Sequence, residues 1–93
     1  MATKLAAAFK TDRIVPPGEV LADELEARGM TQTELAHRMG RPIQTVNAIV
    51  TAKKSITAET ALHLEQALGI SAEFWVNLES TYQLAKAREK AAR

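Results

Sequence analysis

A short segment in the middle of the chain carries side chains suited to reading the bases of a nucleic acid. Gln44 and Asn47 are three residues apart, so on a helix they lie on one face. A carboxamide presents a hydrogen-bond donor beside an acceptor, the pattern that matches the edge of adenine in the major groove. Val46 and Ile49 are apolar and would be buried on the opposite face. The spacing therefore predicts a helix over about residues 43–51 with a buried side and a polar, solvent-facing side.

Side chains around this segment could make further contacts with DNA. Gln32 is expected at the start of the preceding helix, where its amide and the free N–H groups of the helix would meet a phosphate. Ile43 could contact a thymine methyl group or simply seal the turn before the helix. Arg41, Lys53 and Lys54 flank the helix and are expected to contact phosphates, although each alone is equally well explained as a solvated surface side chain. The full set of candidate DNA-contacting residues is Gln32, Arg41, Ile43, Gln44, Thr45, Asn47, Ala48, Thr51, Lys53 and Lys54.

Charge is segregated along the chain, although the formal net charge is only +1. Residues 35–58 contain four Lys and Arg residues and no acid, whereas the windows 14–34 and 59–79 on either side are acidic. A basic window between acidic ones predicts one face that meets a polyanion while the rest of the surface keeps the protein soluble.

Length and composition exclude several other classes of protein. The 93 residues and 10.1 kDa allow one small domain, and the absence of Cys removes disulfides, thiolate metal sites and cysteine nucleophiles. The longest apolar run, residues 5–9, is far too short for a membrane span, which predicts a cytoplasmic protein without membrane contact. His37 and His63 lack a third ligand at metal spacing, and no catalytic triad or Gly-rich phosphate loop is present. We therefore expect neither an enzyme nor a metal or cofactor site.

The elements that must position the candidate residues are predicted to be five helices, an all-α fold. Gly18 is expected to cap the first helix, and Thr31 with Glu34 forms a capping box for the second. Thr57 and Ser71 are expected to cap the last two. The predicted helices span about residues 18–28, 32–39, 43–51, 58–68 and 72–93.

The last of these helices is long and carries more apolar residues than a core needs. Phe74, Trp75, Leu78, Tyr82 and Ala85 fall on one side at helical spacing and are expected to face the core. A domain this small is marginally stable alone, so a partner subunit would add stability. The apolar residues outside that side are expected to form a homodimer contact, and they are Val76, Leu84 and Ala87.

The second and third predicted helices, joined by a turn at Gly40, describe a helix-turn-helix. Residues 32–40 and 44–49 resemble the helix-turn-helix of the lambda-repressor/Cro-like (XRE) class. Residues 16–87 more specifically resemble the HigA family of antitoxins. The segments that carry this second resemblance are Pro17-Gly18-Glu19-Val20-Leu21, Ser55-Ile56-Thr57-Ala58-Glu59-Thr60-Ala61-Leu62 and Glu73-Phe74-Trp75-Val76-Asn77-Leu78.

The resemblance implies a five-helix, lambda-repressor-like DNA-binding domain over residues 16–93, preceded by an N-terminal extension over residues 1–15. It further implies a homodimer that binds operator DNA, represses its own operon and neutralises a HigB-type toxin, a ribosome-dependent mRNA nuclease of RelE-like fold. The chain departs from the family at Thr51-Ala52, where Asn-Gly is frequent, and Ala suits a positive φ less well than Gly. Two alternatives therefore stay open: a stand-alone XRE-type regulator without a toxin, and a toxin-binding module that has lost operator recognition.

Overall fold

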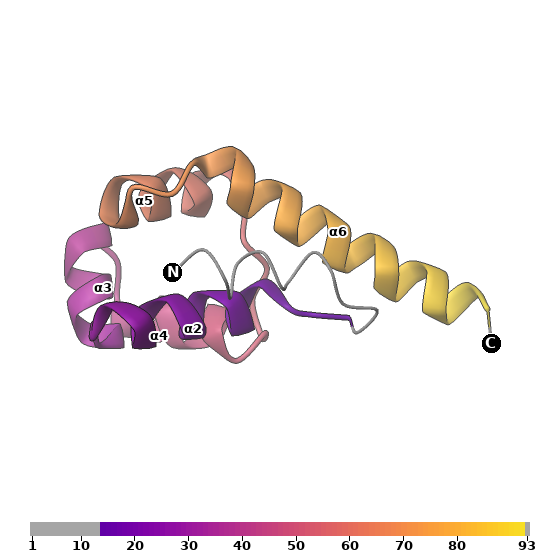
Figure 1. Cartoon of the computed structure of the whole chain (residues 1–93), viewed down its shortest axis with the longest axis horizontal. Coiled ribbons are helices and arrows are strands. Elements are labelled where there is room, and N and C mark those ends of the chain that lie inside the picture. The colour runs from indigo at the N-terminus through magenta and orange to yellow at the C-terminus, as the bar shows by residue number, and fades with distance from the viewer. Residues whose placement is uncertain (1–13, 93) are drawn as a thin grey trace.

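The computed structural model describes residues 14–92 as an all-α fold, and no strand occurs within that range. Helices α2, α3, α4 and α5 pack together, and α6 begins against them and then projects beyond the rest of the domain (Figure 1). None of the described helices is long and apolar enough to cross a membrane. The expected five helices are confirmed within residues 14–92, and they are α2 (Pro17–Arg28), α3 (Gln32–Met39), α4 (Ile43–Val50), α5 (Ala58–Leu68) and α6 (Ala72–Ala91).

Three helices begin at the hydroxyl caps that the sequence predicts. The Thr31 hydroxyl accepts a hydrogen bond from the Glu34 N–H at 3.0 Å. The hydroxyls of Thr57 and Ser71 each accept one at 3.2 Å from the N–H three residues further on. These bonds satisfy N–H groups that lack a partner inside the helix. The predicted starts of α3, α5 and α6 are therefore confirmed.

The start of α2 corrects the predicted role of Gly18. Pro16 is the N-cap of α2, and Gly18 lies inside the first turn of the helix, where it is buried. A Cβ atom at this position would lie 1.9 Å from the Ile49 carbonyl oxygen and 2.7 Å from that of Val50. Gly18 therefore allows the first turn of α2 to pack against the end of α4, and its predicted capping role was wrong.

The core is almost entirely aliphatic, as the composition indicates. Trp75 is its one large aromatic residue within the described range, and the Phe74 ring meets the Trp75 ring edge-on with 5.2 Å between centroids. Phe74, Tyr82 and Ala85 are only partly buried, so three of the five residues of α6 that were expected to face the core are not fully enclosed by it. The buried hydrophobic residues are Val20, Leu21, Leu25, Leu35, Ala36, Met39, Val46, Ile49, Ile56, Ala61, Leu64, Leu68, Trp75 and Leu78.

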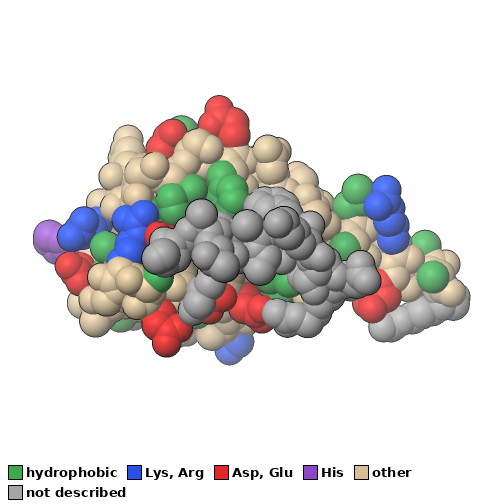
Figure 2. Space-filling model, in the orientation of Figure 1, with side chains coloured by type: hydrophobic (Ala, Val, Ile, Leu, Met, Phe, Trp, Pro, Cys, Tyr) green, Lys and Arg blue, Asp and Glu red, His purple; other side chains and the backbone are tan. Residues whose placement is uncertain are grey.

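Charged side chains are segregated on the surface as well as along the chain. On the face shown in Figure 2, Asp and Glu side chains lie along the edge over α2 and at the opposite edge over α5 and α6. Lys and Arg side chains gather at the end of the molecule near α3 on this face (Figure 2). The same view shows further Lys and Arg side chains at the lower edge and on the projecting part of α6, so basic side chains are not confined to the end near α3 (Figure 2).

Candidate nucleic-acid interface

Helices α3 and α4 are joined by the tight turn that a helix-turn-helix requires. Gly40 ends α3 with a φ of 67°, in the left-handed region that glycine adopts without strain. The Arg41 N–H donates to the Ala36 carbonyl oxygen at 3.0 Å, and Pro42 is the N-cap of α4. Because Pro42 has no N–H group, it needs no hydrogen-bond acceptor of its own at this position before the first turn. The short turn thus fixes the angle at which α4 leaves α3.

The outer face of α4 carries the amide side chains expected to read bases. Gln44 and Asn47 are both exposed, and the Ile43 side chain is 41% exposed beside them. On the opposite face Val46 and Ile49 are 0% and 1% exposed and lie in the core. The buried and polar sides predicted from residue spacing are therefore the two sides of α4.

A hydrogen bond between two amide side chains links the start of α3 to the middle of α4. The Asn47 Nδ2 atom donates to the Gln32 Oε1 atom at 3.2 Å. This bond leaves the Asn47 Oδ1 acceptor and the Gln32 Nε2 donor available for other partners. The sequence did not indicate this pair, because the two residues lie on different helices and nothing in their spacing brings them together. The bond restricts the rotation of the Asn47 side chain before any ligand is bound.

Several predicted residues come together around one shallow hollow on this surface. It lies between the start of α3, the outer face of α4 and the loop that follows α4. Six of the ten candidate residues line it, and they are Gln32, Ile43, Gln44, Asn47, Ala48 and Lys53.

The other four candidates lie at its margins and have different surroundings. Thr51 donates its hydroxyl hydrogen to the Asn47 carbonyl oxygen at 2.8 Å, so this side chain helps to end α4. The Arg41 guanidinium lies 3.4 Å from the His63 Nδ1 atom of α5. Thr45 is half-buried on α4, whereas Lys54 is exposed on the loop.

The loop after α4 adopts a left-handed conformation at a residue that is not glycine. Ala52 has a φ of 63°, and no other non-glycine residue within the described range has a positive φ. The Ala52 N–H donates to the Ile49 carbonyl oxygen at 3.0 Å, and the Lys53 N–H donates to that of Ala48 at 2.8 Å. These two bonds form the helix-ending motif in which glycine normally supplies the left-handed residue. Ala52 therefore adopts the left-handed conformation that glycine adopts without strain, despite the departure at Thr51-Ala52.

Two short helices, a glycine turn and an exposed second helix backed by the core define a helix-turn-helix protein. The helix-turn-helix family model matches residues 21–75, which is more than half of the chain. Antitoxin HigA-1 from Vibrio cholerae is 37% identical over 79 residues, covering 84% of this chain and 74% of that protein.

Solved structures show the same likeness over nearly the whole described range. A HigA-family addiction module antidote protein from Coxiella burnetii has a TM-score of 0.81 and 40% identity, with 86% of this chain and 88% of that chain covered. Pseudomonas aeruginosa antitoxin HigA, solved with the higBA promoter, has a TM-score of 0.81 and 37% identity over the same shares of the two chains. The chain thus belongs to the HigA antitoxins of the helix-turn-helix family.

Proposed function

We propose that this protein is a homodimeric repressor that binds operator DNA and serves as the antitoxin of a HigB-type toxin. The observation that carries the DNA-binding part is the pair of exposed amides, Gln44 and Asn47, on a helix held from behind by buried side chains. The toxin-binding part rests on membership of the HigA family. The promoter bound to the Pseudomonas relative supports an operator as the DNA target.

In this proposal α4 lies in the major groove and its amides contact base edges. Gln44 and Asn47 each present a donor and an acceptor, as adenine requires. Gln32 holds Asn47 through its Oε1 atom and directs its Nε2 atom, together with the N-terminus of α3, toward a phosphate. Ile43 and Ala48 give the same surface apolar area for contact with a thymine methyl group.

The residues at the margin of this surface are assigned to the DNA backbone. Lys53 and Lys54 are exposed on the loop after α4, and Arg41 lies on the turn before it, so cations bracket the helix at both ends. Thr45 and Thr51 add hydroxyl groups near the same surface. Contacts of this kind fix the register of a protein on DNA and make its affinity depend on salt.

The proposed dimer uses the projecting part of α6. Leu84 is 51% exposed and Ala87 is also exposed, whereas Val76 is partly buried and packs against the core of its own subunit. Leu84 and Ala87 therefore carry the proposed subunit contact. Two subunits of the proposed domain, residues 16–93, would present their α4 helices to half-sites about 34 Å apart on one side of the duplex.

The test compares one base-reading residue with one phosphate-contacting residue. Gln44→Ala should reduce the preference for operator over random duplex by about 1–3 kcal/mol, because it removes a base contact. Lys53→Ala should lower the affinity for both duplexes by the same factor. It should also reduce the slope of log affinity against log salt concentration by about 1 for each subunit that loses the contact. Filter binding at several salt concentrations measures both quantities. Equal effects of the two substitutions on operator and random DNA would refute the base-reading assignment.

The two alternatives make different predictions in the same experiment. A toxin-binding module without operator recognition would show no preference for its own promoter, and the closed, hydrogen-bonded turn at Ala52 argues against it. A stand-alone regulator would bind its operator but would not form a complex with any small protein encoded beside it. Co-purification with the product of the adjacent reading frame separates that alternative from the antitoxin.

A further inference from the structure

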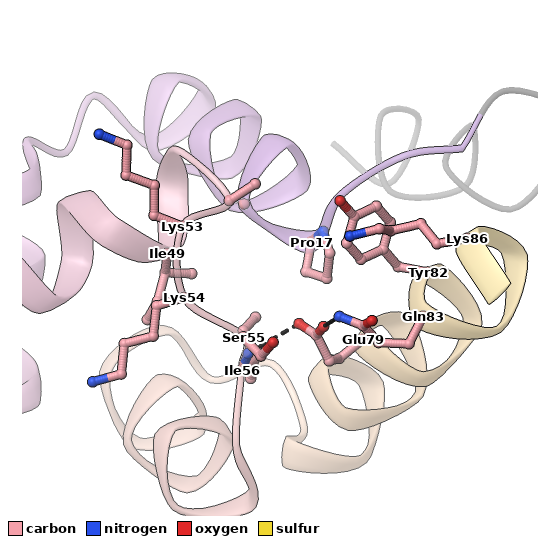
Figure 3. Close-up of a pocket in the computed structure, with 12 residues that line it drawn as sticks. Pro17, Ile49, Lys53, Lys54, Ser55, Ile56, Glu79, Tyr82, Gln83 and Lys86 are labelled. Atoms are coloured by element: carbon pink, nitrogen blue, oxygen red, sulfur yellow. Dashed lines mark hydrogen bonds between the residues drawn. The ribbon is translucent and has the colours of Figure 1, made fainter. Parts of the chain in front are cut away.

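A crevice separates the loop after α4 from the middle of α6. It is small, about 90 Å³. Residues 52–56 and the α6 side chains between Glu79 and Lys86 line it on opposite sides, and Pro17, Gly18 and Ile49 complete the lining. The Glu79 carboxylate points across the crevice toward the loop (Figure 3). Its Oε1 atom accepts a hydrogen bond from the Ile56 N–H at 2.9 Å, which joins two segments that are far apart in the sequence.

The Glu79 side chain is itself held in place. Its second oxygen, Oε2, accepts a hydrogen bond of 2.6 Å from the Gln83 Nε2 atom one turn further along α6. Glu79 is half-buried, and a hydrogen bond to a charged group in such a place is stronger than one between neutral groups. Ile56 is thus fixed twice, by this bond to its N–H and by its side chain, which is 4% exposed in the core.

Glu79 completes the fixing of the loop that carries two of the proposed phosphate contacts. At the start of the loop, the Ala48 carbonyl oxygen accepts from the N–H groups of Lys53 and Lys54 at 2.8 and 3.1 Å. At its end, Glu79 holds Ile56, so only a few residues separate the two anchors. Both lysine side chains point away from the crevice and from α6 (Figure 3). The two anchors therefore set the position, relative to α4, of the backbone from which both lysine side chains extend.

We propose that Glu79 is a positioning residue for DNA binding, which it promotes by holding the Ile56 N–H and with it the loop of Lys53 and Lys54. This inference rests on the proposed function. It also predicts that removal of the Glu79 carboxylate lowers the affinity for DNA. This direction is unusual, because removing a negative charge from a DNA-binding protein ordinarily strengthens its binding. Glu79 instead strengthens DNA binding, because the gain from holding the loop of Lys53 and Lys54 in place outweighs the repulsion between its carboxylate and the phosphates.

The experiment compares Glu79→Ala with Glu79→Gln and with Glu73→Ala. Glu79→Gln keeps an oxygen that can accept from the Ile56 N–H, whereas Glu79→Ala does not. Glu73 is an exposed acid in the first turn of α6, so Glu73→Ala makes the same change in net charge without touching the loop. Amide hydrogen exchange at Ile56 reports the bond directly, and filter binding to operator and random duplexes at several salt concentrations reports its effect.

We expect Glu79→Ala to speed exchange at Ile56 by about tenfold or more, as the loss of one protecting hydrogen bond implies. We expect it to lower the affinity for operator and for random duplex by similar factors, about five- to tenfold. The affinity should also depend less steeply on salt concentration, because phosphate contacts are lost. Glu79→Gln should restore most of the affinity, and Glu73→Ala should bind DNA as tightly as the unmodified protein or slightly more tightly. In a background that carries Lys53→Ala and Lys54→Ala, Glu79→Ala should have almost no further effect.

Several results would overturn the inference. It fails if Glu79→Ala binds DNA as tightly as the unmodified protein, if Glu79→Gln loses as much as Glu79→Ala, or if the loss persists without the two lysines. Circular dichroism identifies a variant that does not fold. If Glu79→Ala does not fold, Glu79→Gln and Gln83→Ala are compared instead. The expected result is then a loss of DNA affinity for Gln83→Ala but not for Glu79→Gln. If the unmodified protein shows no salt-dependent binding to DNA, the proposed function itself is wrong, which is a separate outcome.

Discussion

Replacing Ala52 by glycine should stabilise the protein, because Ala52 occupies a conformation that suits glycine. Its φ of 63° is close to the values of 65°, 67° and 75° at Gly29, Gly40 and Gly69, which end α2, α3 and α5. An L-residue in the left-handed region costs about 1–2 kcal/mol. Glycine at this position costs about 0.4–1 kcal/mol of folding free energy, because it gives the unfolded chain more conformational freedom. Subtracting this cost from the strain that is relieved predicts that Ala52→Gly stabilises the fold by about 1 kcal/mol.

The gain is measurable by thermal and urea unfolding followed by circular dichroism. A stabilisation of about 1 kcal/mol raises the Tm of a domain of this size by about 4–8 °C. Protein concentration must be equal for all variants, because the proposed dimer would make the Tm depend on it. Ala52 is exposed, so the loss of its methyl group removes little buried surface and does not mask the backbone effect.

Ala27→Gly is the matched control for this substitution. Ala27 is exposed like Ala52 but lies within helix α2, where glycine is less favourable than alanine by about 0.5–1 kcal/mol. The same change of side chain should therefore stabilise at one position and destabilise at the other. If Ala52→Gly is neutral or destabilising with an unchanged urea m-value, residue 52 does not hold a positive φ in solution and the reasoning about the loop is refuted.

Two further substitutions test the packing of α2 and the proposed subunit contact. Gly18→Ala should lower the free energy of unfolding by about 3 kcal/mol or more, because its Cβ would meet the backbone oxygens of Ile49 and Val50 and backbone cannot move aside as a flexible side chain can. Gly69→Ala, which meets no atom within 4 Å, should lose only about 1 kcal/mol, so equal losses at the two glycines would contradict the steric account. Leu84→Glu should convert the proposed dimer to a monomer in sedimentation equilibrium while each subunit stays folded, and a dimer of unchanged affinity would remove Leu84 from the proposed contact.

The helices were largely predictable because the chemistry that starts and ends a helix is local. Thr31, Thr57 and Ser71 each bond to an N–H group three residues away, so the pattern is visible in a short stretch of sequence. The role of Gly18 was not predictable in this way. What excludes a side chain there is the carbonyl of Ile49, which only the packing of α2 against α4 brings near.

The candidate surface was predictable only where one helix determines it. Helical periodicity places Gln44 and Asn47 opposite Val46 without reference to the rest of the chain. The bond from Asn47 to Gln32 joins two helices, so no local pattern indicates it. Glu79 is one acid among several in its window, and its bond to the Ile56 N–H depends on where α6 meets the loop.

Two sets of features around α4 would contribute to DNA binding in different ways. The buried side of α4 and the turns at its two ends form a rigid frame, and the exposed amides of Gln44 and Asn47 form the surface that would contact bases. A helix of eight residues is not stable alone in water, so α4 depends on its buried side and on the turns at Gly40 and Ala52 that fix its two ends. Groups that are already ordered lose less conformational entropy when a partner binds. A substitution that disturbs the rigid frame should therefore lower the affinity for every DNA sequence by a similar factor. Substitution of Gln44 should instead change which sequence is preferred. A change in the frame that altered sequence preference as strongly as a change at Gln44 would show that the two roles are not separable in this protein.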